Sequence, residues 1–295
     1  MVVTAVAYFG DMENGISKPK IMLCDDGITR VVKFNHPPEL NRSLFHEFVG
    51  HRIAELLDLP VLDQELVYVP PELTDAYSNI EGMSSGIKVG TPLADVDKNL
   101  TDNGLFREPF KRLYGSCLNR HVIPGIFAFD IWVHNNDRGS NKGNILVVPD
   151  KNGNKQLYIH DHGFAFFEPA ATMERYKKLT EFRGAHLDWQ RHRYPFGPIY
   201  EALKAHVDLT DCSKNPFGPY ITRIESISRE KLEQIMKDVP QEWKIPEYEK
   251  NAVISFLYDR RYAVRMCIDY LVKIFWFPEW NGGELMWPVL HVSSS

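Results

Sequence analysis

The sequence has few cysteines and no long apolar run. Its 295 residues include four cysteines, too few and too widely spaced for a disulfide framework or a CxxC metal site. No apolar stretch reaches the roughly 18 residues that a membrane-spanning helix needs, and the first residues lack the basic and apolar segments of a signal peptide. We therefore expect a protein without a membrane span in a reducing compartment, most simply the cytoplasm.

An excess of basic residues is also missing. Lys and Arg together number 34 against 39 for Asp and Glu, which gives a net charge of −5 and argues against binding nucleic acid over a broad face. With 44% hydrophobic, 12% aromatic and 25% charged residues, the composition is that of an ordinary globular protein. The length predicts one large domain or two lobes.

Two other kinds of site are not favoured by the sequence. The stretch Gly82-Met83-Ser84-Ser85-Gly86 has the letters of GxSxG, but it lies in a connection and precedes a short strand, not the helix that follows the serine in a hydrolase's nucleophile elbow. His46 and His51 lie five residues apart on an expected helix, whereas helical zinc sites prefer a spacing of four, and no cysteine accompanies the pair His160 and His162. A serine hydrolase and a zinc site are therefore disfavoured.

The first ninety residues predict a small antiparallel sheet interrupted by one helix. The apolar residues between Asn35 and Leu59 recur at helical spacing, and Asp25-Asp26-Gly27 predicts a hairpin turn. Short β-rich runs separated by turn residues are the expected strands: Val2–Phe9, Lys20–Cys24, Arg30–Phe34, Glu65–Val69 and Gly86–Val89. We place a lobe boundary here, with a first unit at 1–90 and a second at 91–295.

Helices dominate the second unit, around one hairpin. A polar string, HNNDRGSNKGN, follows the apolar run Ile126–Val133 and precedes two short apolar runs joined by an Asn-Gly turn, the strongest short hairpin signal. Ser228 is expected to cap one later helix, and the apolar spacing from Val253 to Phe275 predicts one longer helix.

The residues that phosphoryl transfer requires are present in the expected order. This chemistry needs a lysine on the nucleotide phosphates, a carboxylate that holds the lysine, an Asp at the attacking hydroxyl, and an Asn and an Asp on Mg²⁺. The candidates are Lys33, Glu47, Asp137, Asn144 and Asp161. Strand alternation turns Lys33 away from Val32 and Phe34. Asn144 and Asp161 stand at the two ends of the predicted hairpin.

These residues lie in motifs that resemble a known family. The string NxDR…NIL…DHG, the VVKF strand with a HEF helix after it, and IESISREKLEQIMKDVPQEW are similar to those of the HipA-like kinases. The resemblance implies a two-lobed, protein-kinase-like α+β fold with a small β-rich N-lobe, a larger helical C-lobe and Mg-ATP in the cleft. It further implies that Lys33 contacts the phosphates and Asp137 is the catalytic base. Asn144 and Asp161 would hold Mg²⁺, and Asn135 would support the loop.

Three features depart from the wider kinase pattern. The metal-binding Asn usually follows the catalytic Asp by five residues, whereas Asn144 follows Asp137 by seven, so either an insertion or a switch of ligand to Asn141 is open. The third motif is DHG rather than DFG, with His162 in place of the apolar residue. No Ala-Pro-Glu follows, so an ordinary activation segment is not expected.

The nucleotide's phosphate loop is predicted from its place between the first two strands, because GxGxxG is absent. Backbone N–H groups there could cradle phosphates, with help from the hydroxyl of Ser17 and from Lys18. The adenine is expected on the connection between the lobes. The candidate cofactor-binding residues besides Lys33 are Gly15, Ile16, Ser17, Lys88 and Val89.

The sequence thus predicts an ATP- and Mg²⁺-dependent kinase that phosphorylates a hydroxyl. The resemblance favours a protein Ser/Thr as acceptor, while a small molecule or a lipid headgroup stays open because no residue marks the acceptor site. A nucleotide-binding pseudokinase that acts as a scaffold is the competing interpretation, supported by the shifted Asn144 and the missing glycine-rich consensus. The resemblance also leaves room for a regulatory protein partner.

Overall fold

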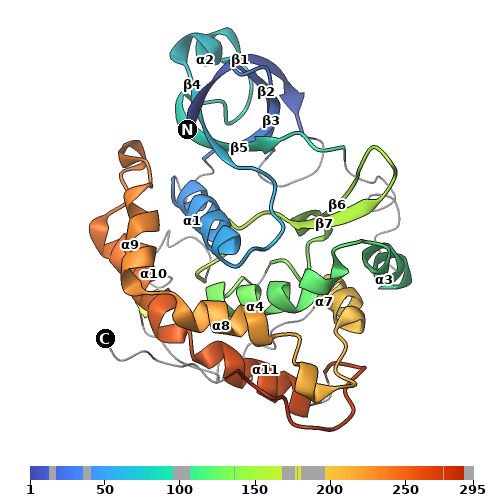
Figure 1. The fold of residues 1–295 in the computed structure, drawn as a ribbon. Helices are drawn as coiled ribbons and strands as arrows, with labels where there is room; N and C mark the ends of the chain where they lie inside the picture. The colour runs from blue at the N-terminus through green and yellow to red at the C-terminus, as the bar shows by residue number, and fades with distance from the viewer. Residues whose placement is uncertain are drawn as a thin grey trace.

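A small barrel of strands lies on a larger group of helices (Figure 1). The structure is a computed structural model, and it describes residues 1–12, 18–35, 41–95, 107–135, 137–167, 177, 179–180, 197–274 and 276–288. Within these ranges no helix is both long and apolar enough to cross a membrane.

The barrel closes in the strand order β1-β2-β3-β5-β4. Its strands are β1 (Val2–Asp11), β2 (Lys20–Cys24), β3 (Thr29–Lys33), β4 (Glu65–Val69) and β5 (Gly86–Pro92). The predicted strands are confirmed, but the prediction of a purely antiparallel sheet is wrong, because β1 and β4 pair in parallel. A parallel pair needs a long crossover, and the segment from β2 through the helix after β3 provides it.

The hairpin of β2 and β3 determines where Lys33 points. The turn at Asp25–Gly27 is confirmed, with Gly27 at a φ of +80° that glycine adopts without strain. Side chains along β3 alternate between the two faces of the barrel wall. Val32 and Phe34 are buried in the barrel core, so Lys33 faces out of the barrel toward the rest of the protein.

The helix after β3, α1 (Arg42–Leu56), lies directly beneath the barrel (Figure 1). Its apolar side chains do not join the barrel core. They pack in the larger apolar core that the helices of the second half build: Leu44, Phe45, Phe48, Val49, Ile53, Ala54 and, just after the helix, Leu57. The helix therefore belongs by packing to the helical part, although it lies between two barrel strands in the chain.

The helical part carries one hairpin, β6 (Ile145–Pro149) with β7 (Lys155–Ile159), as predicted. Its α-helices are α3 (Arg107–Gly115), α4 (Ile123–Val133), α7 (Pro198–Leu203), α8 (Gly218–Ser226), α9 (Arg229–Lys237), α10 (Glu247–Arg260) and α11 (Ala263–Lys273), and α2 (Pro71–Ala76) follows β4 near the barrel. Short 3₁₀ turns lie at Arg120–Val122, Lys142–Asn144, Lys204–His206, Cys212–Lys214 and Gln241–Trp243. The helix α4, whose residues are almost all apolar, is buried along its whole length.

Two predictions about the last helices have different outcomes. The Ser228 cap is confirmed, because its hydroxyl oxygen accepts a hydrogen bond from the backbone N–H of Lys231. The prediction of a single helix from Val253 onward is wrong, because the chain turns between α10 and α11. Arg261 lies at this turn and donates to the carbonyl oxygens of Tyr258 and Ile227, contacts that helical spacing in the sequence cannot indicate.

Candidate active site

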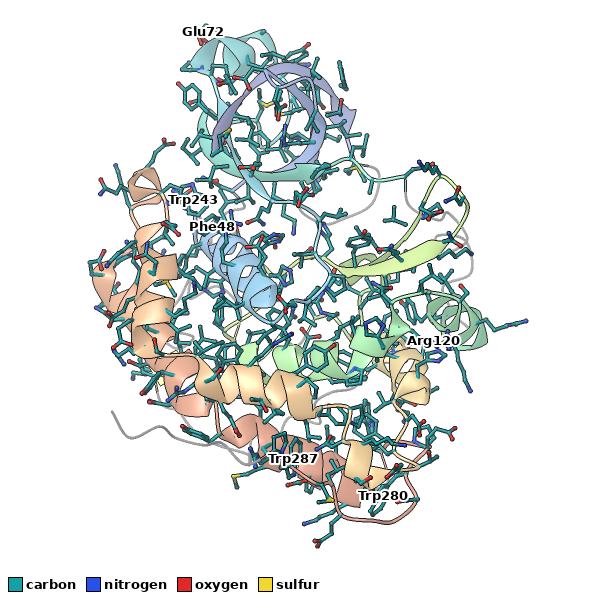
Figure 2. All side chains as sticks on the ribbon, viewed as in Figure 1. Phe48, Glu72, Arg120, Trp243, Trp280 and Trp287 are labelled. Carbon is teal, nitrogen blue, oxygen red and sulfur yellow. The ribbon has the colours of Figure 1, made fainter. Side chains whose placement is uncertain are left out.

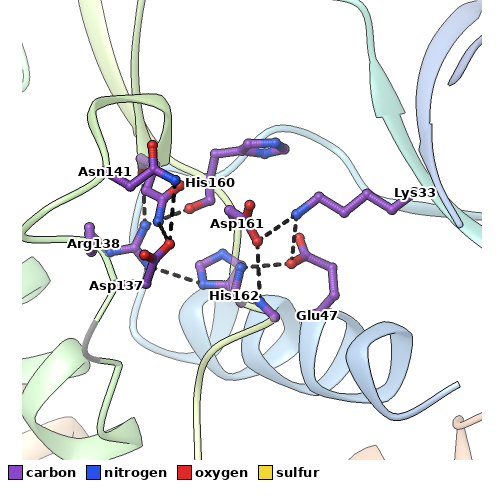
Figure 3. A network of polar contacts seen from close by, with 10 residues as sticks. Lys33, Glu47, Asp137, Arg138, Asn141, His160, Asp161 and His162 are labelled. Atoms are coloured by element: carbon purple, nitrogen blue, oxygen red, sulfur yellow. Dashed lines mark hydrogen bonds and ion pairs between the residues drawn. The ribbon is translucent and has the colours of Figure 1, made fainter. Parts of the chain in front are cut away.

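The Lys33 side chain is held between two carboxylates. Its Nζ lies 2.8 Å from Oε2 of Glu47 on α1 and 2.9 Å from Oδ1 of Asp161, which follows β7 (Figure 3). The three side chains thus come from the barrel, from α1 and from the hairpin. The structure brings together three candidates that are separated by up to 128 residues in the chain.

The ionisation of these groups suits a phosphate site. Burial alone would lower the pKa of Lys33, but Asp161 and Glu47 outweigh it and raise that pKa. Burial would raise the pKa of Asp161, but the ammonium group of Lys33 holds it well below its ordinary value. Lys33 is therefore a cation and Asp161 an anion at neutral pH. Beside them, burial and the charge of Lys33 lower the pKa of His160 to about 4, so this imidazole is neutral.

The DHG motif places its histidine in the protein interior. His162 is 1% exposed, and its ring packs edge-on against Phe129 and His51, with ring centroids 5.5 and 6.0 Å apart. Its backbone N–H donates to Glu47 Oε2 at 2.7 Å. Burial holds its pKa well below the usual value, so a neutral ring packs where the DFG motif has phenylalanine. A Cβ at Gly50 would lie 2.6 Å from Cβ of His162, so α1 needs glycine at this point.

The loop around Asp137 is built from its own polar side chains. Asn135 Oδ1 accepts a hydrogen bond from the backbone N–H of Asp137 at 3.1 Å. The amide Nδ2 of Asn144 donates to Asp137 Oδ2 at 2.6 Å, whereas Nδ2 of Asn141 is 3.5 Å from the same oxygen. Asn141 Oδ1 accepts from the N–H of Gly143 and caps the short 3₁₀ turn before β6. Of the two asparagines, Asn144 has the closer contact with Asp137.

The candidate metal ligands stand at the open end of the hairpin. The carbonyl oxygen of Asn144 accepts from the N–H of His160 at 2.9 Å, which brings Asn144 beside the segment that carries Asp161. Among the described residues, no hydrogen bond or ion pair ends on Oδ2 of Asp161 or on Oδ1 of Asn144. Mg²⁺ prefers such oxygen ligands and usually combines one or two carboxylates with substrate phosphates. The donor set therefore fits Mg²⁺, and the described residues contain no cluster of three His, Cys, Asp or Glu side chains for zinc.

Arg138 connects all of these segments. It is fully buried, and its Nε donates to both carboxylate oxygens of Asp130 on α4, at 2.8 and 3.0 Å. Nη1 donates to the carbonyl oxygens of Asn144 and His160, and Nη2 lies 3.2 Å from Nδ1 of His162. No motif in the sequence predicted this role of Arg138. The one signal for it is Asp130, because a carboxylate buried within an apolar helix needs a cationic partner.

The predicted nucleotide-binding residues stay predictions, and only some of them lie in the part of the chain that the structure describes. Gly15, Ile16 and Ser17 lie outside the described residues, and Lys18 forms an exposed ion pair with Glu81. Lys88 and Val89 lie inside β5, where Val89 is paired with both β3 and β4. The strand β5 ends at Pro92. The buried Lys88 side chain donates to the carbonyl oxygen of Ser85, so Lys88 and Val89 stay predictions as nucleotide contacts.

Comparisons with known proteins bear on the family and the fold. A family model described as HipA-like kinase matches residues 6–193. The fold is similar to the crystal structure of the Helicobacter pylori proinflammatory kinase CtkA, with a TM-score of 0.57 and 16% identity, over 90% of this chain and 94% of that one. HipA of Shewanella oneidensis, solved with HipB and operator DNA, aligns at 10% identity with a TM-score of 0.41, over 90% of this chain and 67% of the other.

No significant match to a curated protein was found. The family match nevertheless spans more than half of the chain, from the barrel through the loop around Asp137 and the hairpin. The similarity to CtkA extends over both the barrel and the helices and confirms a kinase-like fold with a β-rich N-terminal part and a helical C-terminal part. The resemblance that the motifs indicated is thus confirmed, and the chain belongs to the HipA-like kinases.

Proposed function

We propose that this kinase transfers the γ-phosphoryl group of ATP to a hydroxyl group, with Mg²⁺ as the cofactor. The observation that carries the proposal is the position of Lys33, 2.8 Å from Glu47 and 2.9 Å from Asp161. Phosphoryl transfer is catalysed mainly by positioning and by charge stabilisation, and it requires this lysine to be paired with a carboxylate. A scaffold protein has no physical need for such a cluster of buried charges.

Each charged group has a proposed part in the reaction. Lys33 neutralises charge on the nucleotide phosphates, and Glu47 keeps the lysine in place. Asp137 accepts the proton of the acceptor hydroxyl. The hydroxyl oxygen forms a bond to the γ-phosphorus while the bond from that phosphorus to the bridging oxygen breaks, which releases ADP. Asn144 and Asp161 would hold Mg²⁺, which neutralises charge on the phosphate oxygens. Arg138 keeps these loops in register through its bonds to both of them.

The family favours a protein Ser/Thr as the acceptor, and we adopt this as the proposed substrate class. A cytoplasmic location and a regulatory protein partner remain expectations from the family and the composition. The acceptor and the catalytic step are tested together by transfer from γ-labelled ATP with Mg²⁺. The acceptors offered are the protein itself, the proteins of a cell extract, and a lipid and small-molecule fraction.

The test compares the wild type with Asp161→Ala and with a matched control, Asp208→Ala. Asp208 is an exposed carboxylate whose hydrogen bonds go to Thr210 in its own turn. We expect labelled protein bands with the wild type and the control, and none with Asp161→Ala. Label in the lipid or small-molecule fraction instead would show that the acceptor is not a protein. Bound ATP without transfer to any acceptor would contradict the proposal and favour the pseudokinase.

A further inference from the structure

Two side chains of the helical part bind one backbone position of the barrel. The N–H of Ile87 on β5 donates to Oε1 of Glu242 at 2.8 Å, and the indole N–H of Trp243 donates to the carbonyl oxygen of Ile87, also at 2.8 Å. β3 ends at Lys33, opposite Val89, two residues further along β5. Glu242 and Trp243 thus satisfy backbone groups that would otherwise lack a partner beyond the end of β3. We call this pair on Ile87 the Ile87 clamp.

The neighbouring glycine shows how closely the two parts approach. Gly86 has a φ of +99°, which L-residues with a side chain rarely adopt. A Cβ at this position would lie 2.0 Å from Oε1 of Glu242. Gly86 is therefore needed both for the backbone conformation and for the contact with the clamp.

The same segment also holds the first turn of α1. The Trp243 ring is buried and packs edge-on against Phe48, with ring centroids 6.0 Å apart (Figure 2). The carbonyl oxygen of Trp243 accepts from Nδ2 of Asn41, the residue before α1, at 3.2 Å. Arg42 donates from Nε and Nη2 to the carboxylate of the buried Glu249, at 2.5 to 3.0 Å. Residues 241–249 therefore contact the barrel and α1 at once.

The other end of α1 is fixed to the helical part as well. Arg223 on α8 donates to the carbonyl oxygen of Leu57 at 2.9 Å and forms an ion pair with Asp58 at 2.8 Å. Both ends of the helix that carries Glu47 are thus bound by residues from the second half of the chain. The barrel has its own small core, and it meets the helical part through β5 and β4: Val89 packs in the helical core, Leu66 and Ile87 pack against it, and Ile87 binds the clamp.

We propose that Trp243 and Glu242 are positioning residues, which hold the barrel against α1 so that Lys33 stays paired with Glu47 without an external activator. Two short chains of contacts carry the effect. Ile87 lies two residues from Val89, the partner of Lys33 in the sheet, and Phe48, which packs on Trp243, follows Glu47 directly. The consequence for activity rests on the proposed function, because pairing of Lys33 with Glu47 matters only if Lys33 binds nucleotide phosphates.

The test compares Trp243→Phe with the matched control Trp280→Phe. Phenylalanine keeps an aromatic ring against Phe48 but removes the N–H that binds Ile87. Trp280 also donates its indole N–H to a backbone carbonyl oxygen, that of Gly283, at 2.8 Å, and it lies at the opposite end of the molecule (Figure 2). Glu242→Ala is the second clamp variant, and because Glu242 is exposed its truncation spares the core. KM for ATP, kcat and hydrogen–deuterium exchange of β5 and α1 are measured for each protein.

With Trp243→Phe we expect faster exchange in β5 and α1 and a KM for ATP raised about two- to tenfold, the range for loss of one neutral hydrogen bond. Glu242→Ala shifts both readouts in the same direction, and Trp280→Phe leaves both at wild-type values. Wild-type exchange in α1, or an unchanged KM, in both clamp variants would overturn the proposal. If the wild type shows no turnover, the proposed function fails, and the exchange measurement alone decides whether the clamp holds β5 and α1.

Discussion

Lys33 and Glu47 join two separate apolar cores of the molecule. Lys33 Nζ and Glu47 Oε2 are 2.8 Å apart, although β3 borders the barrel core and α1 packs in the helical core. The side chain of Lys33 is 13% exposed and that of Glu47 3%, so water screens the pair weakly. The pair therefore depends on how the two parts of the chain are held together.

Replacing Glu47 by Gln tests this relationship directly. The amide removes the negative charge beside Lys33 but keeps the shape of the side chain. We expect kcat/KM to fall by about 10- to 100-fold, the range for loss of a hydrogen bond between charged groups. Glu55→Gln is the control, because Glu55 lies on the same helix and pairs with Arg52 and His51 rather than with Lys33. Equal activity of the two variants would show that the charge of Glu47 is not needed for turnover.

Arg138 and Asp130 form a buried ion pair whose two halves can be removed separately. Arg138→Gln leaves the Asp130 carboxylate buried without its cation, and we expect a loss of about 3 to 5 kcal/mol in the free energy of unfolding. Adding Asp130→Asn removes the stranded charge, so the double variant is expected to be more stable than Arg138→Gln alone. Urea unfolding measures both, with Arg229→Gln as a control for an exposed ion pair. A double variant that is less stable than Arg138→Gln would contradict this account.

The choice between Asn144 and Asn141 as metal ligand is open to measurement. Asn144 contacts Asp137 at 2.6 Å and leaves its side-chain oxygen for a cation, while the oxygen of Asn141 caps a turn. We expect Asn144→Ala to raise the Mg²⁺ concentration needed for half-maximal turnover by at least about tenfold, the usual magnitude for a weakened metal site. Asn141→Ala should change it little. The reverse ranking would assign the ligand to Asn141.

Buried neutral histidines predict a loss of stability in mild acid. Burial, with a smaller effect from the charge of Arg42, outweighs the hydrogen bond to the Ala165 carbonyl and lowers the pKa of His46 to about 4. Because the folded-state pKa lies below the unfolded one, the unfolded chain binds more protons between pH 6.5 and 4. The contribution of His46 to the free energy of unfolding is thus complete above pH 6.5. About 3 kcal/mol of it is lost as the pH falls to about 4.

Urea unfolding between pH 7 and 4 checks this with His46→Gln, whose amide can still donate to Ala165. The free energy of unfolding of the wild type should fall more steeply with decreasing pH than that of the variant. Parallel curves for the two proteins would show that His46 does not titrate as the structure implies.

Local patterns explain the part of the site that could be predicted. The alternation of VVKF turned Lys33 away from the barrel core, and the Asn-Gly turn predicted the hairpin that brings Asn144 toward the segment of Asp161. The order of charged residues along the chain then indicated the pairing of Lys33 with Glu47. These features depend on strand periodicity, turn chemistry and one helix, which neighbouring residues largely determine.

The remaining features depend on contacts between distant residues. The parallel pairing of β1 with β4 closes the barrel across more than fifty residues of chain, so no local signal marks it. Trp243 meets Ile87 across 156 positions, and its sequence context shows only a turn after a helix. The buried bonds of Arg138 likewise need Asp130, Asn144 and His160 to be in place at once. Such contacts follow from the fold and cannot be derived from spacing along the chain.

The most direct test of the central claim is turnover and ATP binding by Asp137→Asn. The Asp137 carboxylate accepts a hydrogen bond from Asn144, its backbone carbonyl accepts from N–H groups of the same loop, and an amide at this position keeps the size of the side chain. If Asp137 accepts the proton of the acceptor hydroxyl, the variant binds Mg-ATP with nearly unchanged affinity, while turnover falls by about 100-fold or more. A variant with wild-type turnover would show that phosphoryl transfer, if it occurs, does not use Asp137, and the proposed mechanism would be wrong.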